Sequence, residues 1–253
     1  MNGHQQVYYI GIDVGTGSAR ACIIDQTGDI VGIASEDIHT WQSQGTFYEQ
    51  STTNIWRSIC RAVKQAVRES GIASSDIRGL GFDATCSLAV MSRTSNQPIS
   101  VTGPDFNTDC NVVLWLDHRA VQETKSINET KHNVLRYVGG TMSVEMEIPK
   151  ILWLKKRMPA DMFKDCKFYD LADALTHMAT GTESRSFCSV ICKQGYIPAG
   201  VDESAEGWQE DFLTSVGLGD LAADNFFRLG GINGCVSVLA SGCPIPSNVA
   251  HYR

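Results

Sequence analysis

Residues near the start of the chain combine a carboxylate, a guanidinium and a flexible turn over a short span. Asp13 ends an apolar run, residues 15–18 form a turn of glycine and hydroxyl residues, and Arg20 leads into a second apolar run. A carboxylate can hold Mg²⁺ through water, because Mg²⁺ keeps most of its hydration shell, and a guanidinium offers phosphate a charge-assisted fork. The order predicts a strand, a tight turn and a returning strand that bind a polyphosphate.

The turn itself has the composition that a phosphate-binding loop needs. Gly15 and Gly17 have no Cβ, so backbone N–H groups can approach phosphate oxygens and positive φ is allowed. Thr16 and Ser18 add hydroxyl donors. A plain hairpin with a glycine turn is the alternative, and the flanking carboxylate and guanidinium favour phosphate binding over it. The segment is neither a Walker loop nor a dinucleotide fingerprint, because it lacks Gly-Lys-Ser/Thr and leads into a strand.

A second cluster of small polar residues follows a buried strand expected at 77–82. The carboxyl ends of such strands point into ligand crevices, which makes the turn at 84–87 a candidate ligand contact. The alternative is a turn that uses small residues for packing. Asp83, at the end of the strand, is the fallback candidate for a catalytic base.

The segment 9–20 resembles the first phosphate motif of the actin-like, RNase H-like sugar kinases. Nearly the whole chain resembles the FGGY carbohydrate kinases, and within them the ribulokinase-like branch. The resemblance implies two RNase H-like domains with ATP and sugar bound between them. This chain would supply only the first, with the C-terminal domain absent and a possible partner.

The resemblance implies that the 84–87 turn reaches the sugar, through Ala84, Cys86 and Ser87. Glycerol kinases carry an Arg-Glu pair where Cys86 and Ser87 stand, and xylulokinases favour a Met-His pair. Neither pair is present, and the missing Arg-Glu pair argues against glycerol as the substrate.

Three more residues are implied to line the sugar. Trp115 and Asp117 lie in a segment that resembles the family's Trp-x-Asp-x-Arg element, where the indole would form an apolar wall and the carboxylate would accept hydroxyl hydrogen bonds. A core tryptophan, with Asp117 as the N-cap of a following helix, is the alternative. Lys193 matches a lysine that binds the ketose in ribulokinases, and it is the best single marker of substrate class. The family's Pro-Lys-x-x-Trp motif covers Lys150, which is expected to be structural.

Phosphoryl transfer to a hydroxyl needs positioning, Mg²⁺ and a base. In the family the base is an aspartate that opens the second domain, and residues 247–253 contain no aspartate, so the catalytic base is expected beyond Arg253. Asp13 is the implied Mg²⁺ site, and the turn with Arg20 would hold the phosphates of ATP. The chain alone is expected to have little or no kinase activity.

Composition narrows the classes of partner. The chain has 253 residues, 43% hydrophobic and 19% charged, with a net charge of −7, which argues against nucleic-acid and anionic-membrane partners. Its nine cysteines are odd in number and irregularly spaced, which favours free thiols in a reducing compartment. The polar start has no signal core and no run reaches about 18 apolar residues, so a cytoplasmic protein is expected. Oligomeric state is not readable from the sequence.

The patterning predicts an α/β domain. Strands are expected at 7–14, 20–25, 30–37, 77–82, 88–92 and 112–116, and helices at 51–70, 118–137, 148–157, 172–180 and 206–216, with an irregular stretch at 40–50. Ser51 and Gly71 are the expected caps of the first helix. This order opens an RNase H-like domain, a mixed sheet flanked by helices, and residues 1–253 are expected to form that domain with a helical insertion at about 118–225.

Two hypotheses follow for function. The first is an ATP-dependent kinase that phosphorylates the terminal hydroxyl of a ketopentose, D-ribulose or a related pentulose. The second is a truncated, non-catalytic sugar-binding or interaction module. Ribulose, ribitol and xylulose differ too little for the sequence to choose among them.

Overall fold

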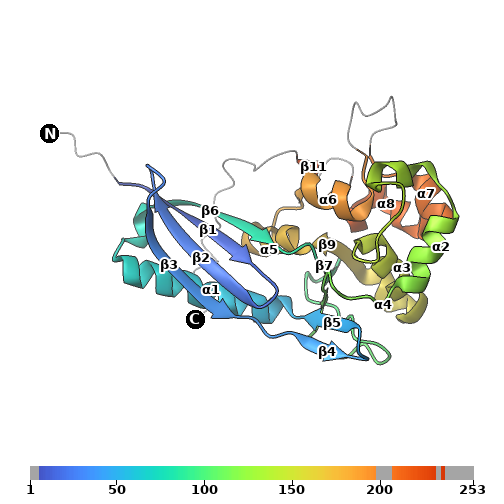
Figure 1. Ribbon diagram of the computed structural model, residues 1–253, viewed down its shortest axis with the longest axis horizontal. Coiled ribbons are helices and arrows are strands. Elements are labelled where there is room, and N and C mark those ends of the chain that lie inside the picture. The colour runs from blue at the N-terminus through green and yellow to red at the C-terminus, as the bar shows by residue number, and fades with distance from the viewer. Residues whose placement is uncertain (1–5, 198–206, 232–234, 237–253) are drawn as a thin grey trace.

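The computed structural model describes residues 6–197 and 207–231, and the backbone of 235–236. A four-stranded sheet at one end of the molecule has the order β3-β2-β1-β6 (Figure 1). Its strands are β1 Tyr8–Val14, β2 Ser18–Asp25, β3 Ile30–Asp37 and β6 Ile77–Ala84. β1, β2 and β3 are antiparallel and β6 is parallel to β1, which confirms the predicted order of the first elements.

β1 shows why the sequence pattern could identify this sheet. Its residues alternate strictly between buried and exposed, because successive side chains of a strand point to opposite faces. The buried set packs against α1 (Thr52–Ser70), which contacts β2 and β3. The Ser51 side chain accepts a hydrogen bond from the Asn54 amide, and Gly71 ends the helix in the left-handed region at φ 68°, so both predicted caps are confirmed.

A second sheet of five strands has the order β4-β5-β8-β7-β9. Its strands are β4 Trp41–Ser43, β5 Phe47–Gln50, β7 Leu88–Ser92, β8 Val112–Val113 and β9 Cys166–Asp170. The expectation of an irregular stretch at 40–50 was wrong, because β4 and β5 form an antiparallel hairpin there and β5 also pairs with β8. β9 was not predicted, and it pairs with β7 along its whole length.

The second sheet lies between two hydrophobic clusters. Every residue of β7 and β9 is buried, so neither strand has the exposed face that produces an alternating pattern. Leu88 and Val90 belong to the cluster on the side of the C-terminal helices, whereas Ala89 and Met91 belong to the cluster shared with the first sheet and α1. The two clusters therefore meet across β7, which ties both halves of the chain into one packed body.

The helix expected at 118–137 was wrong in its bounds. α2 spans Val121–Glu129, and the 3-10 segment η2 spans Asn133–Val138. Between them Lys131 adopts a positive φ of 51°, which no α-helix permits. Continuous polar and apolar periodicity across residues 118–137 concealed this break.

The remaining helices surround the β7–β9 side of the molecule (Figure 1). They are α3 Glu147–Arg157, α4 Ala160–Asp165, α5 Leu171–Thr180, α6 Phe187–Gln194, α7 Glu210–Ser215 and α8 Ala223–Phe226, with 3-10 segments η3 Gly219–Ala222 and η4 Phe227–Leu229. The 3-10 segment η1 Ser74–Asp76 instead joins α1 to β6 of the first sheet. The short strands β10 (Arg185–Ser186) and β11 (Cys235–Val236) pair in parallel. The helices expected at 148–157 and 172–180 are confirmed, whereas α7 covers only part of 206–216.

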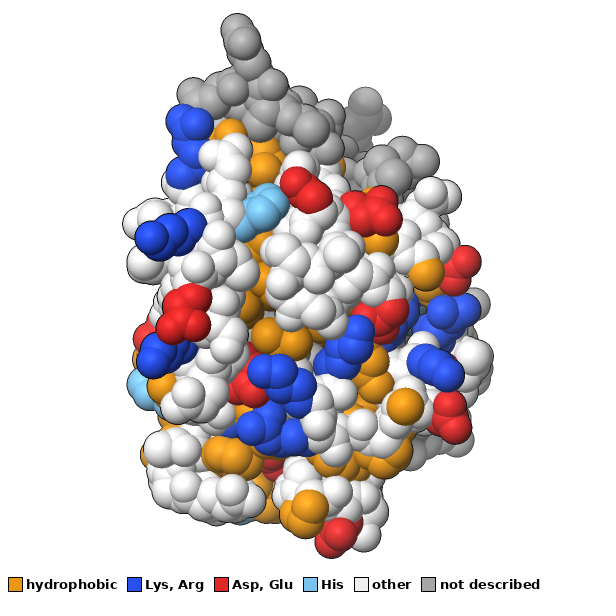
Figure 2. All heavy atoms as spheres, turned by 90° about the vertical axis from the view of Figure 1, so that its right-hand side faces the viewer, with side chains coloured by type: hydrophobic (Ala, Val, Ile, Leu, Met, Phe, Trp, Pro, Cys, Tyr) orange, Lys and Arg blue, Asp and Glu red, His pale blue; other side chains and the backbone are white. Residues whose placement is uncertain are grey.

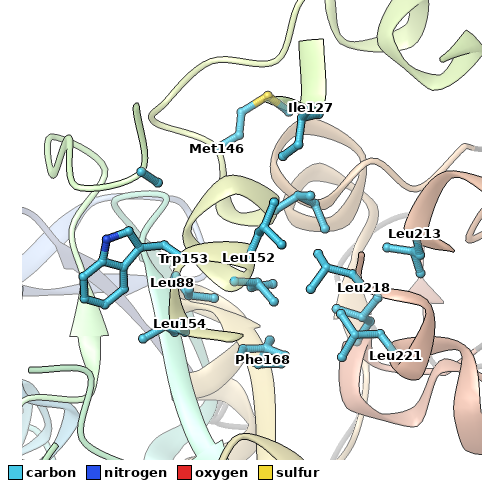
Figure 3. Close-up of a cluster of buried hydrophobic side chains, with 14 of the residues drawn as sticks. Leu88, Ile127, Met146, Leu152, Trp153, Leu154, Phe168, Leu213, Leu218 and Leu221 are labelled. Carbon is cyan, nitrogen blue, oxygen red and sulfur yellow. The ribbon is translucent and has the colours of Figure 1, made fainter. Parts of the chain in front are cut away.

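α3 lies in the centre of the larger hydrophobic cluster. Figure 3 shows Leu152, Trp153 and Leu154 of this helix beside the strand residues Leu88 and Phe168, with Leu213, Leu218 and Leu221 farther to the right. On the outer surface of this end of the molecule, acidic and basic side chains are interspersed among polar ones (Figure 2). No helix among the described residues is both long and apolar enough to cross a bilayer.

Candidate functional site

The turn between β1 and β2 leaves backbone donors free. The Gly15 amide donates to the Ser18 carbonyl at 2.9 Å, which closes the turn. Within the described residues, the amides of Thr16 and Gly17 have no acceptor. A Cβ built on Gly17 would meet nothing within 4 Å, so the tip of the turn is open, and neither turn glycine adopts the positive φ that the sequence allowed. Two backbone N–H groups are thus available to an anion.

The predicted carboxylate and guanidinium pair with each other across this hairpin. Arg20 Nη2 lies 2.7 Å from Asp13 Oδ2, and both side chains are about half exposed, at 51% and 53%. Gly15 makes room for this arrangement, because a Cβ there would stand 3.1 Å from Arg20 Nη2. An exposed ion pair of this kind contributes only about 0–1 kcal/mol, so an incoming phosphate and metal can replace it at small cost.

β6 brings the 84–87 segment beside the turn. Asp13 and Asp83 are register partners in the parallel β1–β6 pair, and the Thr85 amide donates to the Val14 carbonyl at 3.0 Å. Both carboxylates belong to exposed residues. No group of three or more His, Cys, Asp or Glu in the described part could hold a metal ion, so a metal here would take two protein carboxylates at most. Hydrated Mg²⁺ suits such a sparse donor set.

Trp115 joins the β1–β2 turn, residues 15–18, to the 84–87 segment. Its backbone amide donates to Ser87 Oγ at 3.2 Å, and its indole Nε1 donates to Thr16 Oγ1 at 3.3 Å. The indole remains 37% exposed, although tryptophan side chains are usually buried in cores. The structure therefore places a partly exposed tryptophan between the two predicted ligand segments.

Asp117 lies inside the protein. Its carboxylate accepts hydrogen bonds from the Tyr48 amide at 2.7 Å and from the backbone and guanidinium of Arg119 at 2.7–3.0 Å, and its side chain is fully buried. Arg119 also contacts Glu49 at 2.8 Å. The alternative that Asp117 caps the following helix was wrong, since α2 begins at Val121 after Ala120, which makes no side-chain cap.

Lys193 lies near the 84–87 segment from the opposite side. It is half-buried in the last turn of α6, a helix ended by Gly195 at φ 76°. Burial, together with the nearby charge of Asp170, raises the pKa of the Cys86 thiol to about 11, against the opposing effect of the Lys193 ammonium. The same ammonium contributes to the lowered pKa of Lys150, so Lys193, Cys86 and Lys150 share one electrostatic environment.

Two buried residues of α3 that the sequence analysis did not assign to the site lie next to it. The Lys150 Nζ donates to the carbonyl oxygens of Leu114 at 2.7 Å and of Trp115 at 3.3 Å, and burial lowers its pKa to about 8. Burial raises the pKa of Glu147 to about 7, and its carboxylate accepts from Gln194 at 2.5 Å. The sequence signal that could have identified them is a glutamate and a lysine three residues apart in an otherwise apolar helix.

Comparisons with known proteins show the family of this chain. The profile of the FGGY family of carbohydrate kinases, N-terminal domain, matches residues 8–196. A D-ribulokinase of Saccharomyces cerevisiae is 54% identical over 225 residues, which are 88% of this chain and 31% of that protein. A human FGGY carbohydrate kinase domain-containing protein is 44% identical over 235 residues, which are 91% of this chain and 41% of that protein. The chain thus spans less than half the length of these relatives.

Solved structures confirm the fold class. A xylulose kinase from Brucella ovis superposes with a TM-score of 0.69 at 20% identity, over 84% of this chain and 42% of that one. Glycerol kinase from Plasmodium falciparum with ADP superposes with a TM-score of 0.69 at 14% identity, over 92% of this chain and 48% of that one. These kinases have the actin-like, RNase H-like fold, whose first domain this α/β chain matches. The chain belongs to the FGGY family of carbohydrate kinases and contains that family's N-terminal domain.

Proposed function

We propose that this chain is the sugar-binding domain and first phosphate motif of an ATP-dependent kinase that phosphorylates the terminal hydroxyl of a ketopentose, D-ribulose or a related pentulose. The observation that supports it most is the position of Trp115, whose open indole joins the phosphate turn to the 84–87 segment. A relative with 54% identity is named a D-ribulokinase.

On the phosphate side, the free amides of the turn and the Arg20 guanidinium would hold phosphate oxygens of ATP. Asp13, with Asp83 beside it, would hold hydrated Mg²⁺. When bound there, Mg²⁺ would neutralise the charge that develops on the phosphate oxygens. Arg20 then exchanges its carboxylate partner for a phosphate oxygen.

On the sugar side, the indole of Trp115 would pack on one face of the sugar. Lys193 would donate hydrogen bonds to sugar hydroxyls or to the carbonyl, and Ala84, Cys86 and Ser87 would line the remaining wall. Asp117 would act indirectly, because its buried carboxylate fixes the segment that follows Trp115. We assign no general base among the described residues.

Calorimetry on the 253-residue chain with D-ribulose, D-xylulose, ribitol and glycerol tests this proposal. We expect binding of a pentulose and no measurable binding of glycerol. Lys193→Ala should weaken the pentulose by about tenfold, the value of one charge-assisted hydrogen bond. Lys125→Ala is the matched control, since that side chain is 71% exposed on α2 and pairs only with Glu129. Equal affinities for the two variants would refute the substrate site.

A phosphorylation assay tests the incomplete catalytic machinery. With ATP, Mg²⁺ and D-ribulose, the 253-residue chain should give little or no sugar phosphate, because the proposal leaves the proton acceptor outside its described residues. Robust turnover by this chain alone would contradict that assignment.

A further inference from the structure

The first turn of α3 lies against three of the segments assigned to the sugar. It carries two ionisable side chains, Glu147 and Lys150, each with no exposed surface. Burying a charge is costly unless it is paired and hydrogen-bonded. The hydrogen-bond partners of Glu147 and Lys150 therefore show which segments these two side chains hold in place. Neither side chain reaches solvent, and neither therefore touches the sugar directly.

Lys150 holds the segment that carries Trp115. Its three ammonium protons match three backbone acceptors, the carbonyl oxygens of Leu114 at 2.7 Å, Trp115 at 3.3 Å and Glu145 at 3.3 Å. The Trp115 amide is fixed in turn by Ser87 Oγ. The backbone on both sides of the Trp115 side chain is therefore anchored. The indole can thus remain partly exposed and still keep a fixed position.

Glu147 holds the end of α6. Its Oε2 accepts from Gln194 Nε2 at 2.5 Å, and Gln194 is the last residue of α6 and is itself buried. Lys193 directly precedes it. Fixing Gln194 fixes the helical turn from which the Lys193 ammonium extends.

Glu147 also contacts the strand next to the 84–87 segment. Its carboxyl interacts electrostatically with that of Asp170, the last residue of β9. Glu147 Oε1 and Asp170 Oδ2 are buried and accept from no donor among the described residues, and a proton shared between the two groups satisfies both. Asp170 is the register partner of Leu88, which directly follows Ser87.

We propose that Glu147 and Lys150 are positioning residues that fix Trp115, Lys193 and the 84–87 segment relative to one another and so set the sugar affinity. The proposal rests on the proposed sugar site. It distinguishes these residues from ordinary core groups, since the hydrogen bonds of Lys150 to Leu114 and Trp115 and that of Glu147 to Gln194 end on a segment of that site or directly beside it.

The first test replaces Lys150 with methionine, which keeps the volume and removes the donors. The matched control is Lys167→Met, because Lys167 is equally buried but lies at the other end of β9, 2.5 Å from Glu183. Calorimetry with the pentulose should show an affinity loss of about tenfold or more for Lys150→Met, and an unchanged affinity for Lys167→Met. If Lys150→Met does not fold, Lys150→Gln replaces it, because glutamine keeps an amide donor. The pentulose affinity of Lys150→Gln should also be lower than that of the wild type.

A second readout needs no sugar. The indole N–H resonance of Trp115, assigned with Trp115→Phe, should shift or broaden in Lys150→Met because its contact with Thr16 depends on the anchored backbone. It should be unchanged in Lys167→Met. An unchanged resonance in Lys150→Met would overturn the role of Lys150. Absence of sugar binding by the wild-type chain would instead refute the proposed function, while the resonance still decides the positioning role.

The third test separates shape from hydrogen bonding at Glu147. Glu147→Gln keeps an oxygen that accepts from Gln194 and gains an amide that donates to Asp170, so its pentulose affinity should stay within about twofold of wild type. Glu147→Leu keeps the volume only and should lose about tenfold or more. Equal affinities for the two variants would overturn the role of Glu147.

Discussion

At the scale of single residues, the phosphate turn shows how little the fold depends on its functional groups. Asp13 and Arg20 pair with each other at 2.7 Å but remain about half exposed. Their types and spacing were readable from the sequence, because a hairpin places its two flanking residues opposite each other. The sequence did not show which backbone amides of the turn would be free, because that depends on which carbonyl accepts the hydrogen bond that closes the turn.

Arg20→Ala should separate binding from stability. We expect affinity for Mg·ADP to fall about tenfold, because a charge-assisted hydrogen bond to phosphate is lost, while the free energy of unfolding changes by less than about 1 kcal/mol. Calorimetry and urea denaturation measure the two quantities. Arg78→Ala is the control, since this exposed arginine of β6 donates a hydrogen bond to the Ser75 carbonyl, away from the β1–β2 turn. A large loss of stability without a loss of affinity would contradict the assignment.

At the scale of elements, α3 serves both packing and the site. Its buried residues include Leu152, Trp153 and Leu154, which fill the larger cluster (Figure 3), while Lys150 near its start bonds the backbone of Leu114 and Trp115. The sequence predicted the helix from its periodicity, with Pro149 tolerated in the first turn. It did not reveal the second role, because the acceptors of Lys150 come from a segment 35 and 36 residues away.

Leu154→Ala tests the packing role. Leu154 has no exposed surface, so we expect a loss of about 2–5 kcal/mol in the free energy of unfolding from lost apolar burial and the cavity left behind. Urea denaturation measures it. Val121→Ala, at an exposed apolar residue that begins α2, should change stability by less than about 0.5 kcal/mol. A loss for Leu154→Ala as small as that of the control would show that the cluster is loosely packed.

At the scale of the whole molecule, buried carboxyl groups make stability depend on pH. Burial raises the pKa of Glu147 to about 7, and it raises that of Asp170 and Asp173 in the same direction. Between the unfolded and folded pKa values the native protein holds protons that the unfolded chain has released. Their stabilisation is therefore complete below the unfolded values and is lost as pH rises through the folded ones. The lowered pKa of Lys150 is about 8, so titration of this lysine changes the pH dependence of stability only at higher pH.

Glu147→Gln should flatten this dependence. The wild-type free energy of unfolding should fall between about pH 5 and about pH 7.5, and the variant should lose part of that fall because its amide does not titrate. Urea denaturation across that range measures both slopes. Glu129→Gln, at a 66% exposed carboxylate, should keep the wild-type slope. Identical slopes for Glu147→Gln and wild type would contradict the raised pKa of Glu147.

The sequence by itself determined the first sheet, the first long helix with its caps, and the β1–β2 turn with its flanking charges. These features are encoded locally, by alternation in β1, by Ser51 and Gly71 at the ends of α1, and by Asp13 and Arg20 around the glycines. Such patterns reach only a few residues along the chain, and they need no knowledge of distant partners.

Tertiary structure alone decided the rest. β9 has no exposed face, so its Lys167 and Asp170 concealed a buried strand that only pairing with β7 defines. Asp117 looked like an exposed acceptor until Arg119 and Tyr48 enclosed it. The grouping of Trp115 with Lys150 likewise depends on contacts between segments far apart in sequence, whose burial and hydrogen bonds exist only after the chain has packed.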